Sequence, residues 1–341
     1  MQQEQEKPRS KRTRNIILII AGVLVIVVAI LGYLVYDRLS EDPIELGRAN
    51  GDLAFMSDRD GNWDIFIMDT EGNMLNITTA SDGHEFGFNF TFEGEVLNLY
   101  TSHSGEVTPG TVNADGTEFQ DLSWVSAFST AFTRDLLDYD PAWSPDGTEI
   151  AFSSIRSLMG SNLYLAPIDS SDPEKLTDGG QSNNMQAWSP DGTRLVFASD
   201  HEDSGGDQHI YVLDVESGDV TKLSTDAGYD IQPVWSLDGE KVLFISEQET
   251  PLTSGQFDFY VVNADGSDLH PLGIDEVFEG DPTYSPDGTE IVYMSNEDGF
   301  WHLYVMDAEG DNVRRLTEGE SNNLFPAWRP IPAEELETEA E

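Results

Sequence analysis

The sequence predicts an all-β fold, a six-bladed beta-propeller preceded by a single transmembrane helix. The phrase Pro-x-Trp-Ser-Pro-Asp-Gly is complete at residues 141–147 and is echoed in six copies between Phe90 and Trp328. Successive copies lie 44 to 53 residues apart, a period typical of stacked supersecondary units. An uncharged stretch of twenty residues precedes the first copy. The copies predict the blades, and the uncharged stretch predicts the helix.

The N-terminal segment has the features of a membrane anchor. Residues 1–15 contain five basic residues, and residues 16–36 form an apolar stretch. As a helix this stretch would span about 30 Å, the thickness of a bilayer core. A cleavable signal peptide is the alternative, but its apolar region is shorter and small residues follow it. The positive-inside rule then predicts a cytoplasmic N-terminus, a linker over residues 37–50 and an extracytoplasmic propeller.

Each copy of the repeat predicts a four-stranded meander over residues 51–330. The Ser-Pro-Asp-Gly turn joins an inner strand to a second strand, whose alternating pattern, as at 149–153, predicts a half-buried strand. A third strand follows, as at 163–165, and a fourth short strand is expected to end in Leu-Thr, as at 176–177. The aromatic residues that anchor the six inner strands are Phe90, Trp143, Trp188, Trp235, Tyr284 and Trp328.

The two ends of the repeat region indicate how the ring closes. Residues 53–57 match a second strand, whereas residues 326–330 match the end of an inner strand. One blade is therefore predicted to take its inner strand from the C-terminal end of the ring and its other three strands from residues 51–79. Residues 331–341 are acidic and too polar to pack, which predicts a disordered tail.

The repeat resembles that of the TolB-like beta-propeller family. The resemblance rests on the phrase at 141–153 and on the Asp-Gly turns and Tyr-containing third strands that follow, and it covers residues 51–330. It implies the propeller and, by analogy, a role in a cell-envelope complex. The same repeat occurs in prolyl oligopeptidase propellers, so it hosts several activities and names no function by itself.

Charge narrows the possible partners. The chain has 17 basic and 64 acidic residues, and outside residues 1–15 the balance is 12 basic to 62 acidic. Such a surface repels nucleic acid and attracts cations or basic proteins. An acidic surface also keeps an exported or salt-adapted protein soluble, which is the alternative reading. There is no cysteine, so no disulfide braces the ring.

One polar position recurs five residues before each anchoring aromatic residue. Propeller symmetry places these six residues around the channel mouth, where clustered carboxylates would bind Ca²⁺ or a small polar ligand. Alternatively, they bond the free amides of the incoming loop and have a structural role. The six residues are Glu85, Asp138, Asn183, Asp230, Glu279 and Asn323.

Loop lengths indicate which face binds a partner. The second-to-third and fourth-to-first connections vary in length and share one face, which is predicted to point away from the membrane. One of them carries Trp124, Phe128 and Phe132, an apolar group that is a candidate partner contact. The sequence lacks a Gly-x-Ser-x-Gly or His-Glu-x-x-His motif. It therefore favours a scaffold in the cell envelope that binds a protein or an envelope polymer, or a smaller ligand. A peptide or carbohydrate hydrolase or lyase, and a sensor, are the alternatives.

Overall fold

A computed structural model describes the propeller. It describes residues 52–330 apart from 70–71, 80–82, 92–93, 104–105, 122–137, 156–159, 168–171, 179–181, 202–205, 226–227, 248–257, 273–278 and 298. The predicted transmembrane helix, linker and acidic tail lie outside these residues. In the described part, no helix has the length and apolar character needed to cross a bilayer.

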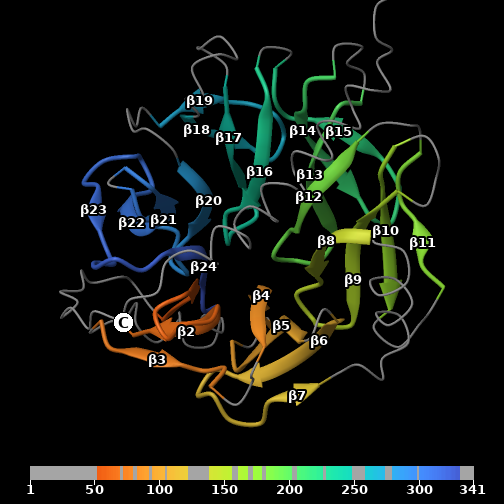
Figure 1. The fold of residues 1–341 in the computed structure, drawn as a ribbon. Helices are drawn as coiled ribbons and strands as arrows, with labels where there is room; N and C mark the ends of the chain where they lie inside the picture. The colour runs from red at the N-terminus through yellow and green to blue at the C-terminus, as the bar shows by residue number, and fades with distance from the viewer. Residues whose placement is uncertain are drawn as a thin grey trace, which may run out of the picture. The chain divides into compact units, whose positions relative to one another are not determined.

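Strands of the described residues form six antiparallel four-stranded sheets, and Figure 1 shows them arranged around a common centre as predicted. The inner strands are β24 (Asn323–Trp328), β4 (His84–Phe90), β8 (Asp138–Trp143), β12 (Asn183–Trp188), β16 (Asp230–Trp235) and β20 (Glu279–Tyr284). The second strands are β1 (Leu53–Ser57), β5 (Val96–His103), β9 (Glu149–Ser154), β13 (Arg194–Ser199), β17 (Lys241–Ser246) and β21 (Glu290–Ser295). The third strands are β2 (Asp64–Met68), β6 (Glu106–Asn113), β10 (Asn162–Pro167), β14 (His209–Asp214), β18 (Asp258–Asn263) and β22 (His302–Asp307). The outer strands are β3 (Met74–Asn76), β7 (Gln120–Asp121), β11 (Glu174–Lys175), β15 (Val220–Lys222), β19 (His270–Pro271) and β23 (Arg314–Arg315).

The Ser-Pro-Asp-Gly turns are built around the aspartate. The Gly147 N–H donates to the Ser144 carbonyl at 2.9 Å, and Gly147 has a φ of 69°, which glycine adopts without strain. The Asp146 carboxylate accepts from the Ser144 hydroxyl at 2.6 Å and from the Thr148 N–H at 3.1 Å. These hydrogen bonds lower the pKa of Asp146. The turn is therefore held by local bonds before the blades pack.

Two expectations for the strands were wrong in detail. The second strands are buried on both faces, as in β9, because neighbouring blades cover each sheet from both sides. The outer strand β11 ends at Lys175, before the Leu-Thr pair. Leu176 instead donates its N–H to the Leu163 carbonyl, and the Thr177 hydroxyl accepts from the Leu163 N–H at 2.9 Å. A side-chain hydroxyl therefore replaces the last backbone rung of the ladder.

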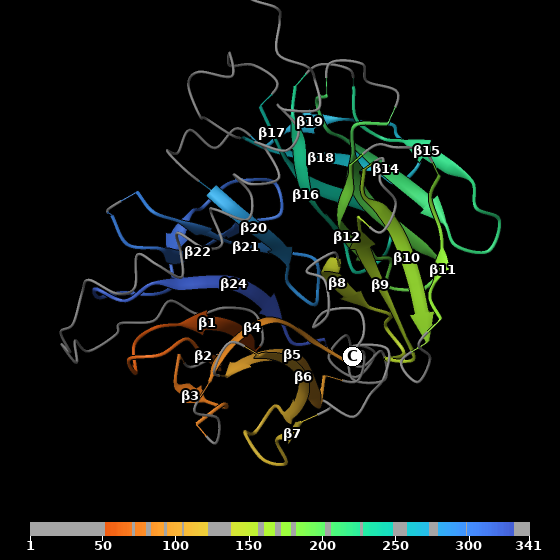
Figure 2. The ribbon, with the colours of Figure 1, turned by 45° about the vertical axis from the view of Figure 1, so that its right-hand side comes forward.

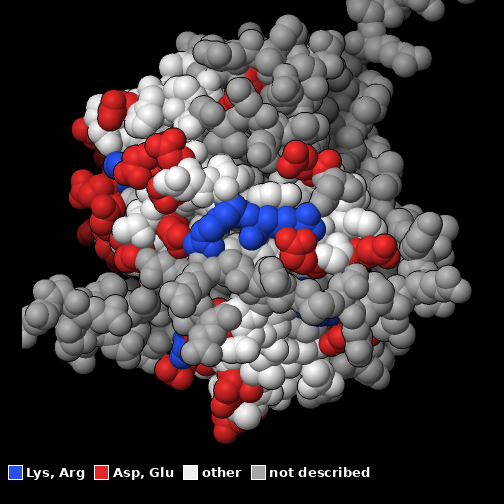
Figure 3. All heavy atoms as spheres, turned by 90° about the vertical axis from the view of Figure 1, so that its left-hand side faces the viewer, with Lys and Arg blue, Asp and Glu red and all other residues white. Residues whose placement is uncertain are grey.

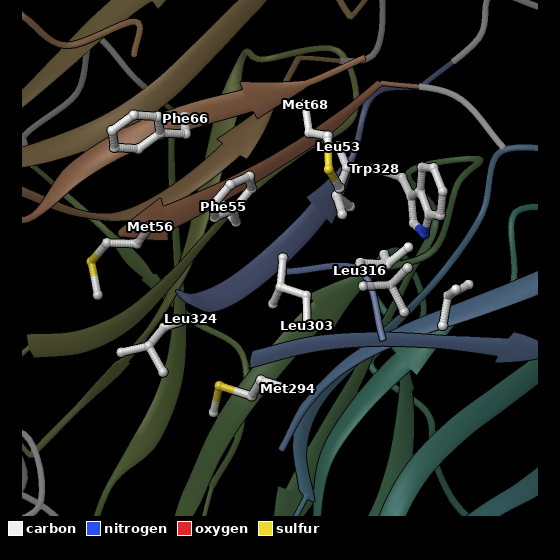
Figure 4. Packing of buried hydrophobic residues seen from close by; sticks show 12 residues of the cluster. Leu53, Phe55, Met56, Phe66, Met68, Met294, Leu303, Leu316, Leu324 and Trp328 are labelled. Atoms are coloured by element: carbon white, nitrogen blue, oxygen red, sulfur yellow. The ribbon is translucent and has the colours of Figure 1, made fainter. Parts of the chain in front are cut away.

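Closure of the ring is confirmed. β24 pairs antiparallel with β1, which aligns Leu53 with Trp328 and Ser57 with Asn323 (Figure 2). Leu53, Phe55 and Trp328 pack with Leu303 and other side chains of the preceding blade in one buried cluster (Figure 4). Sequence-distant parts of the chain thus share one sheet and one core.

Polar contacts reinforce the closure at both ends of the β1–β24 pair. The Asp58 carboxylate accepts from the Asn322 backbone N–H and side-chain amide, each at 2.9 Å. At the opposite end, the Arg329 guanidinium donates to Asp52 at 2.9 Å and to the Gly94 carbonyl at 2.8 Å. Closure is therefore fastened on both faces of the ring.

Candidate functional site

The six predicted polar residues begin the inner strands or lie one residue inside them. The four whose side chains are described, Glu85, Asn183, Asp230 and Asn323, are almost completely buried. Asn183 accepts from the Ser199 hydroxyl at 2.8 Å and donates to the Ser161 carbonyl at 2.8 Å. This contact joins the inner strand to its own second strand and to the third strand of the previous blade.

The equivalent contact differs between blades. The Asp230 carboxylate accepts from the Ser246 hydroxyl and lies 3.4 Å from His209 Nδ1. Asn323 accepts from the Arg59 guanidinium at 2.8 Å, and Glu85 accepts from the Thr101 hydroxyl at 3.3 Å. The partners of these side chains are hydroxyl, guanidinium, imidazole and carbonyl groups of the protein. The structural alternative, in which they bond free amides of the incoming loop, stays a prediction.

Binding of Ca²⁺ or a polar ligand at these six residues stays a prediction. Asp138 and Glu279 begin β8 and β20 in the same register, and their side chains lie outside the described part. Among the residues that the structure describes, no three acidic or histidine side chains converge as a metal site. The aromatic residues Trp124, Phe128 and Phe132 lie outside the described residues, so their role as a partner contact also stays a prediction.

A different ring of residues lines the axis. Each inner strand carries a β-bulge, seen as a register shift against its second strand. One residue in each bulge has a φ between 46° and 58°, a conformation that is uncommon for residues other than glycine. In ring order these residues are Phe325, Gly87, Asp140, Met185, Gln232 and Asp281. They lie two residues after the predicted polar position.

Hydrogen bonds link these bulges from blade to blade. The Gln232 amide donates to Asp281 Oδ1 at 3.0 Å, and its own oxygen accepts the Asp281 backbone N–H at 3.0 Å. The Met185 backbone N–H donates to Asp140 Oδ2 at 3.2 Å. Asp140 and Asp281 belong to the third and sixth blades, so they approach the axis from opposite sides. The side chains at this level therefore face a common central space.

Both axis carboxylates have perturbed protonation. Burial raises the pKa of Asp140, against an opposing hydrogen bond from the Met185 N–H. Burial also raises the pKa of Asp281 to about 7, and the charge of Asp140 raises it further while the Gln232 hydrogen bond opposes both. Perturbed carboxyl groups gather at functional sites, because structural stability alone does not favour them. The pair can hold a proton or a cation near neutral pH.

Apolar side chains complete the same end of the ring. Phe325, at the axis position of β24, is 43 % exposed. Phe300, which precedes β22 in the adjacent blade, is 37 % exposed, and the Trp301 carbonyl beside it accepts the N–H of Asn323 at the start of β24. Phe300 therefore lies near the face where the inner strands begin, and Phe325 lies two residues inside β24 from that face. The two carboxylates have the same bulge position on their own inner strands.

Sequence reasoning missed these axis residues, although a signal was present. A proline directly follows the axis residue in four blades, at Pro141, Pro233, Pro282 and Pro326. Proline donates no backbone hydrogen bond, and within sheets it is found at edge strands, at strand starts and at bulges. The innermost strand is a sheet edge, so proline alone fits either an edge or a bulge; in these four blades it directly follows the bulge residue.

The surface around the ring is acidic. Figure 3 shows one face on which Asp and Glu side chains are widely spread and Lys and Arg gather mainly in one strip. Several described basic side chains are engaged inside the protein. Arg314 pairs with Glu290 at 2.7 Å, and Arg194 lies over the Trp235 ring at 4.5 Å. Such engagement leaves the acidic excess of the chain to dominate its outer field.

Comparisons with known proteins agree with the beta-propeller fold. Residues 135–253 match the family model described as the TolB beta propeller domain. No curated protein matches the sequence significantly. Among solved structures, TolB from Acinetobacter baumannii is similar with a TM-score of 0.64 and 19 % identity, covering 83 % of this chain and 68 % of that one.

Two further structures have the same fold. A putative TolB from Agrobacterium tumefaciens has a TM-score of 0.58 and 20 % identity, with 84 % of this chain and all (100 %) of that chain covered. A chain from a nidogen/laminin complex has a TM-score of 0.58 and 13 % identity, with 82 % and 98 % covered. At these identities the likeness shows the fold. The protein thus has the fold of a six-bladed beta-propeller similar to that of TolB, and its repeat matches the family model over residues 135–253.

Proposed function

We propose that the protein is a membrane-anchored, extracytoplasmic scaffold that binds a partner protein at the end of the axis near Phe325. The observation that carries this proposal is the set of residues at the bulge position of the inner strands, where one strand has an exposed aromatic side chain and two others have carboxyl groups with a raised pKa. Exposed apolar surface on a strongly charged domain is typical of a partner site. A similar propeller was solved in a complex of two proteins, nidogen and laminin, which is consistent with this use of the fold.

The path of the chain shows on which face of the ring the linker enters. β1 begins at Leu53, which pairs with Trp328 at the far end of β24 from Asn323. The chain therefore enters the ring on the face opposite the one where β24 begins. The linker to the proposed anchor therefore joins that opposite face, and the face where β24 begins is left clear of its attachment for a partner in the envelope.

The test is site-specific photocrosslinking in the cells that make the protein. A photoreactive phenylalanine analogue replaces Phe325 in one variant and Val220, which is 44 % exposed on the outer strand β15, in a control. We expect a discrete crosslinked protein from position 325 and none from position 220. No adduct at 325, or the same adducts at both positions, would contradict the proposal. Protease added to spheroplasts checks the topology, because it should digest the propeller without lysis.

Catalysis is the second candidate, and Asp281 favours it. A carboxyl group with a pKa of about 7 suits general acid–base chemistry at neutral pH. A hydrolase or lyase using it would lose about 100-fold or more in rate on Asp281→Asn, as loss of a general base does. Assay of the full chain against peptide and oligosaccharide panels, with that variant alongside, separates this candidate from binding alone.

A further inference from the structure

The two carboxylates at the axis lack a positively charged partner within the described residues. Asp281 Oδ1 accepts from the neutral Gln232 amide, and Asp281 Oδ2 is buried without a hydrogen-bond partner in the described part of the chain. Asp140 accepts from a backbone N–H, and no described lysine or arginine pairs with it. A buried carboxylate oxygen without a partner is costly, so this arrangement needs an explanation.

A cation supplied by a ligand would satisfy this site. Asp140 and Asp281 face the same central space from opposite blades and repel one another when both are ionised. A positively charged donor between the two carboxylates can form hydrogen bonds with both. Such charge-assisted hydrogen bonds are about twice as strong as neutral ones. Such a donor would bond Asp281 Oδ2, the oxygen without a hydrogen-bond partner among the described residues, while Gln232 keeps Oδ1.

The neighbouring side chains select the kind of cation. Phe325 has the bulge position of β24, in the first blade, and it is 43 % exposed. Met185 has the same position in the fourth blade, but its side chain packs against the buried cluster around Trp235. An aromatic face accommodates an aliphatic stem and attracts an organic cation. A hydrated metal ion makes no use of such a surface. A basic side chain, with its stem and charged head, fits both halves of the site.

We propose that the axis binds a lysine or arginine side chain presented by a segment of the partner protein, with Asp140 and Asp281 on the charged head and Phe325 along the stem. This inference rests on the proposed scaffold function and names the chemistry of the docked segment. The acidic surface around the ring would draw such a segment toward the site.

Binding of the basic side chain should release protons. A nearby positive charge favours the ionised carboxyl and so lowers the pKa of Asp281, which lies near 7 in the free protein. At pH 6 to 7, as read from that pKa, a fraction of the protons on Asp281 leaves when the cation enters. This linkage gives a readout that is independent of any variant.

The experiment is a calorimetric titration of the full-length protein in detergent micelles. The probe is a capped pentapeptide with one arginine between glycines, and its match carries the neutral isostere citrulline. We expect the arginine peptide to bind at least about 30-fold more tightly, the lower range for loss of a partner from a buried charge pair. Titrations in two buffers with different ionisation enthalpies should show proton release for arginine alone.

Matched variants locate the site. Asp281→Asn and Asp140→Asn should each weaken the arginine peptide by about 30-fold, and Asp281→Asn should abolish proton release. Glu216→Gln removes the same charge from an exposed turn and should change neither. Equal binding of the arginine and citrulline peptides, unchanged binding by both aspartate variants, or response to CaCl₂ but not to the peptide would overturn the inference. A crosslink at position 325 that survives Asp281→Asn would retain the scaffold function while rejecting this cationic anchor.

Discussion

At the scale of single residues, each inner strand has two positions with different roles, the polar residue near its start and the bulge residue two positions later. The polar position that begins the strand is buried and fastens blades together, as Asn183 does through Ser161 and Ser199. The position two residues later is turned to the axis by the bulge and is free to vary from glycine to phenylalanine to aspartate. The structural role and the proposed ligand-binding role thus belong to neighbouring positions of one strand.

Asp281 makes stability depend on pH in a defined direction. Its pKa in the folded protein is raised to about 7 from 3.8, so between these values the folded state holds more protons than the unfolded state. The stabilisation is complete below the lower value and is lost as pH rises through the higher one. Asp281→Asn does not ionise, so its melting temperature relative to the parent protein should rise from pH 5 to pH 8.

Thermal unfolding of the full chain at several pH values checks this prediction. Asparagine keeps the acceptor for Gln232, which limits other effects of the change. Glu216→Gln is the control and should follow the parent protein at every pH. A constant difference between Asp281→Asn and the parent protein across this range would show that Asp281 ionises normally.

At the scale of the element, one inner strand shows why the same position carries different residues. Four blades have proline after the axis residue, whereas β12 has Gln186. The Gln186 amide donates to the backbone carbonyl of Asp140 and, at 3.3 Å, to that of Ala151, and its oxygen accepts from the Ser153 hydroxyl at 2.8 Å. This glutamine therefore joins β12 to the preceding blade, where the prolines supply stiffness instead.

Gln186→Pro should destabilise the protein although proline occupies the equivalent position in four blades. Proline at a compatible position contributes about 0.4–1 kcal/mol through the unfolded state. Loss of the three side-chain hydrogen bonds leaves buried groups unpaired at about 1–3 kcal/mol each. This cost exceeds the contribution of proline, so the variant should be less stable than its parent by at least about 1 kcal/mol. Urea denaturation measures the difference, and Pro282→Ala, which removes only the stiffness, is the matched comparison. A Gln186→Pro variant as stable as its parent would refute the bridging role.

The strands were predictable and the bulges were not, for a physical reason. Burial patterns and turn residues act locally, so Ser-Pro-Asp-Gly at 144–147 and the apolar run in β9 identify a hairpin directly. The bulge at Asp140 depends on the match between an inner strand and its neighbour, which is a property of pairing. The prolines are consistent with it, but the raised pKa of Asp281 comes chiefly from burial in the assembled ring, to which the charge of Asp140 adds a smaller part.

At the scale of the whole molecule, stability depends on joining the two ends of the ring. β24 contributes Leu324 and Trp328 to the buried cluster shared with β1, β2 and the preceding blade. Deleting residues 324–341 removes this strand and exposes an edge on each side, so the ring should lose cooperative unfolding. Deleting only 332–341 leaves β24 whole and should leave the melting temperature unchanged. Equal behaviour of the two truncations in thermal unfolding would contradict closure by the shared blade.

The shared blade also determines how the ring would bear force. β1 is the first strand after the proposed anchor and is bonded on one side to β24 and on the other to β2. If a bound partner drew the ring away from the membrane, tension would run lengthwise along β1 from Leu53. Its hydrogen-bond rungs on both sides would then be loaded together in shear, rather than parted one after another as in unzipping. The same closure that completes the fold would make the junction with the anchor mechanically strong.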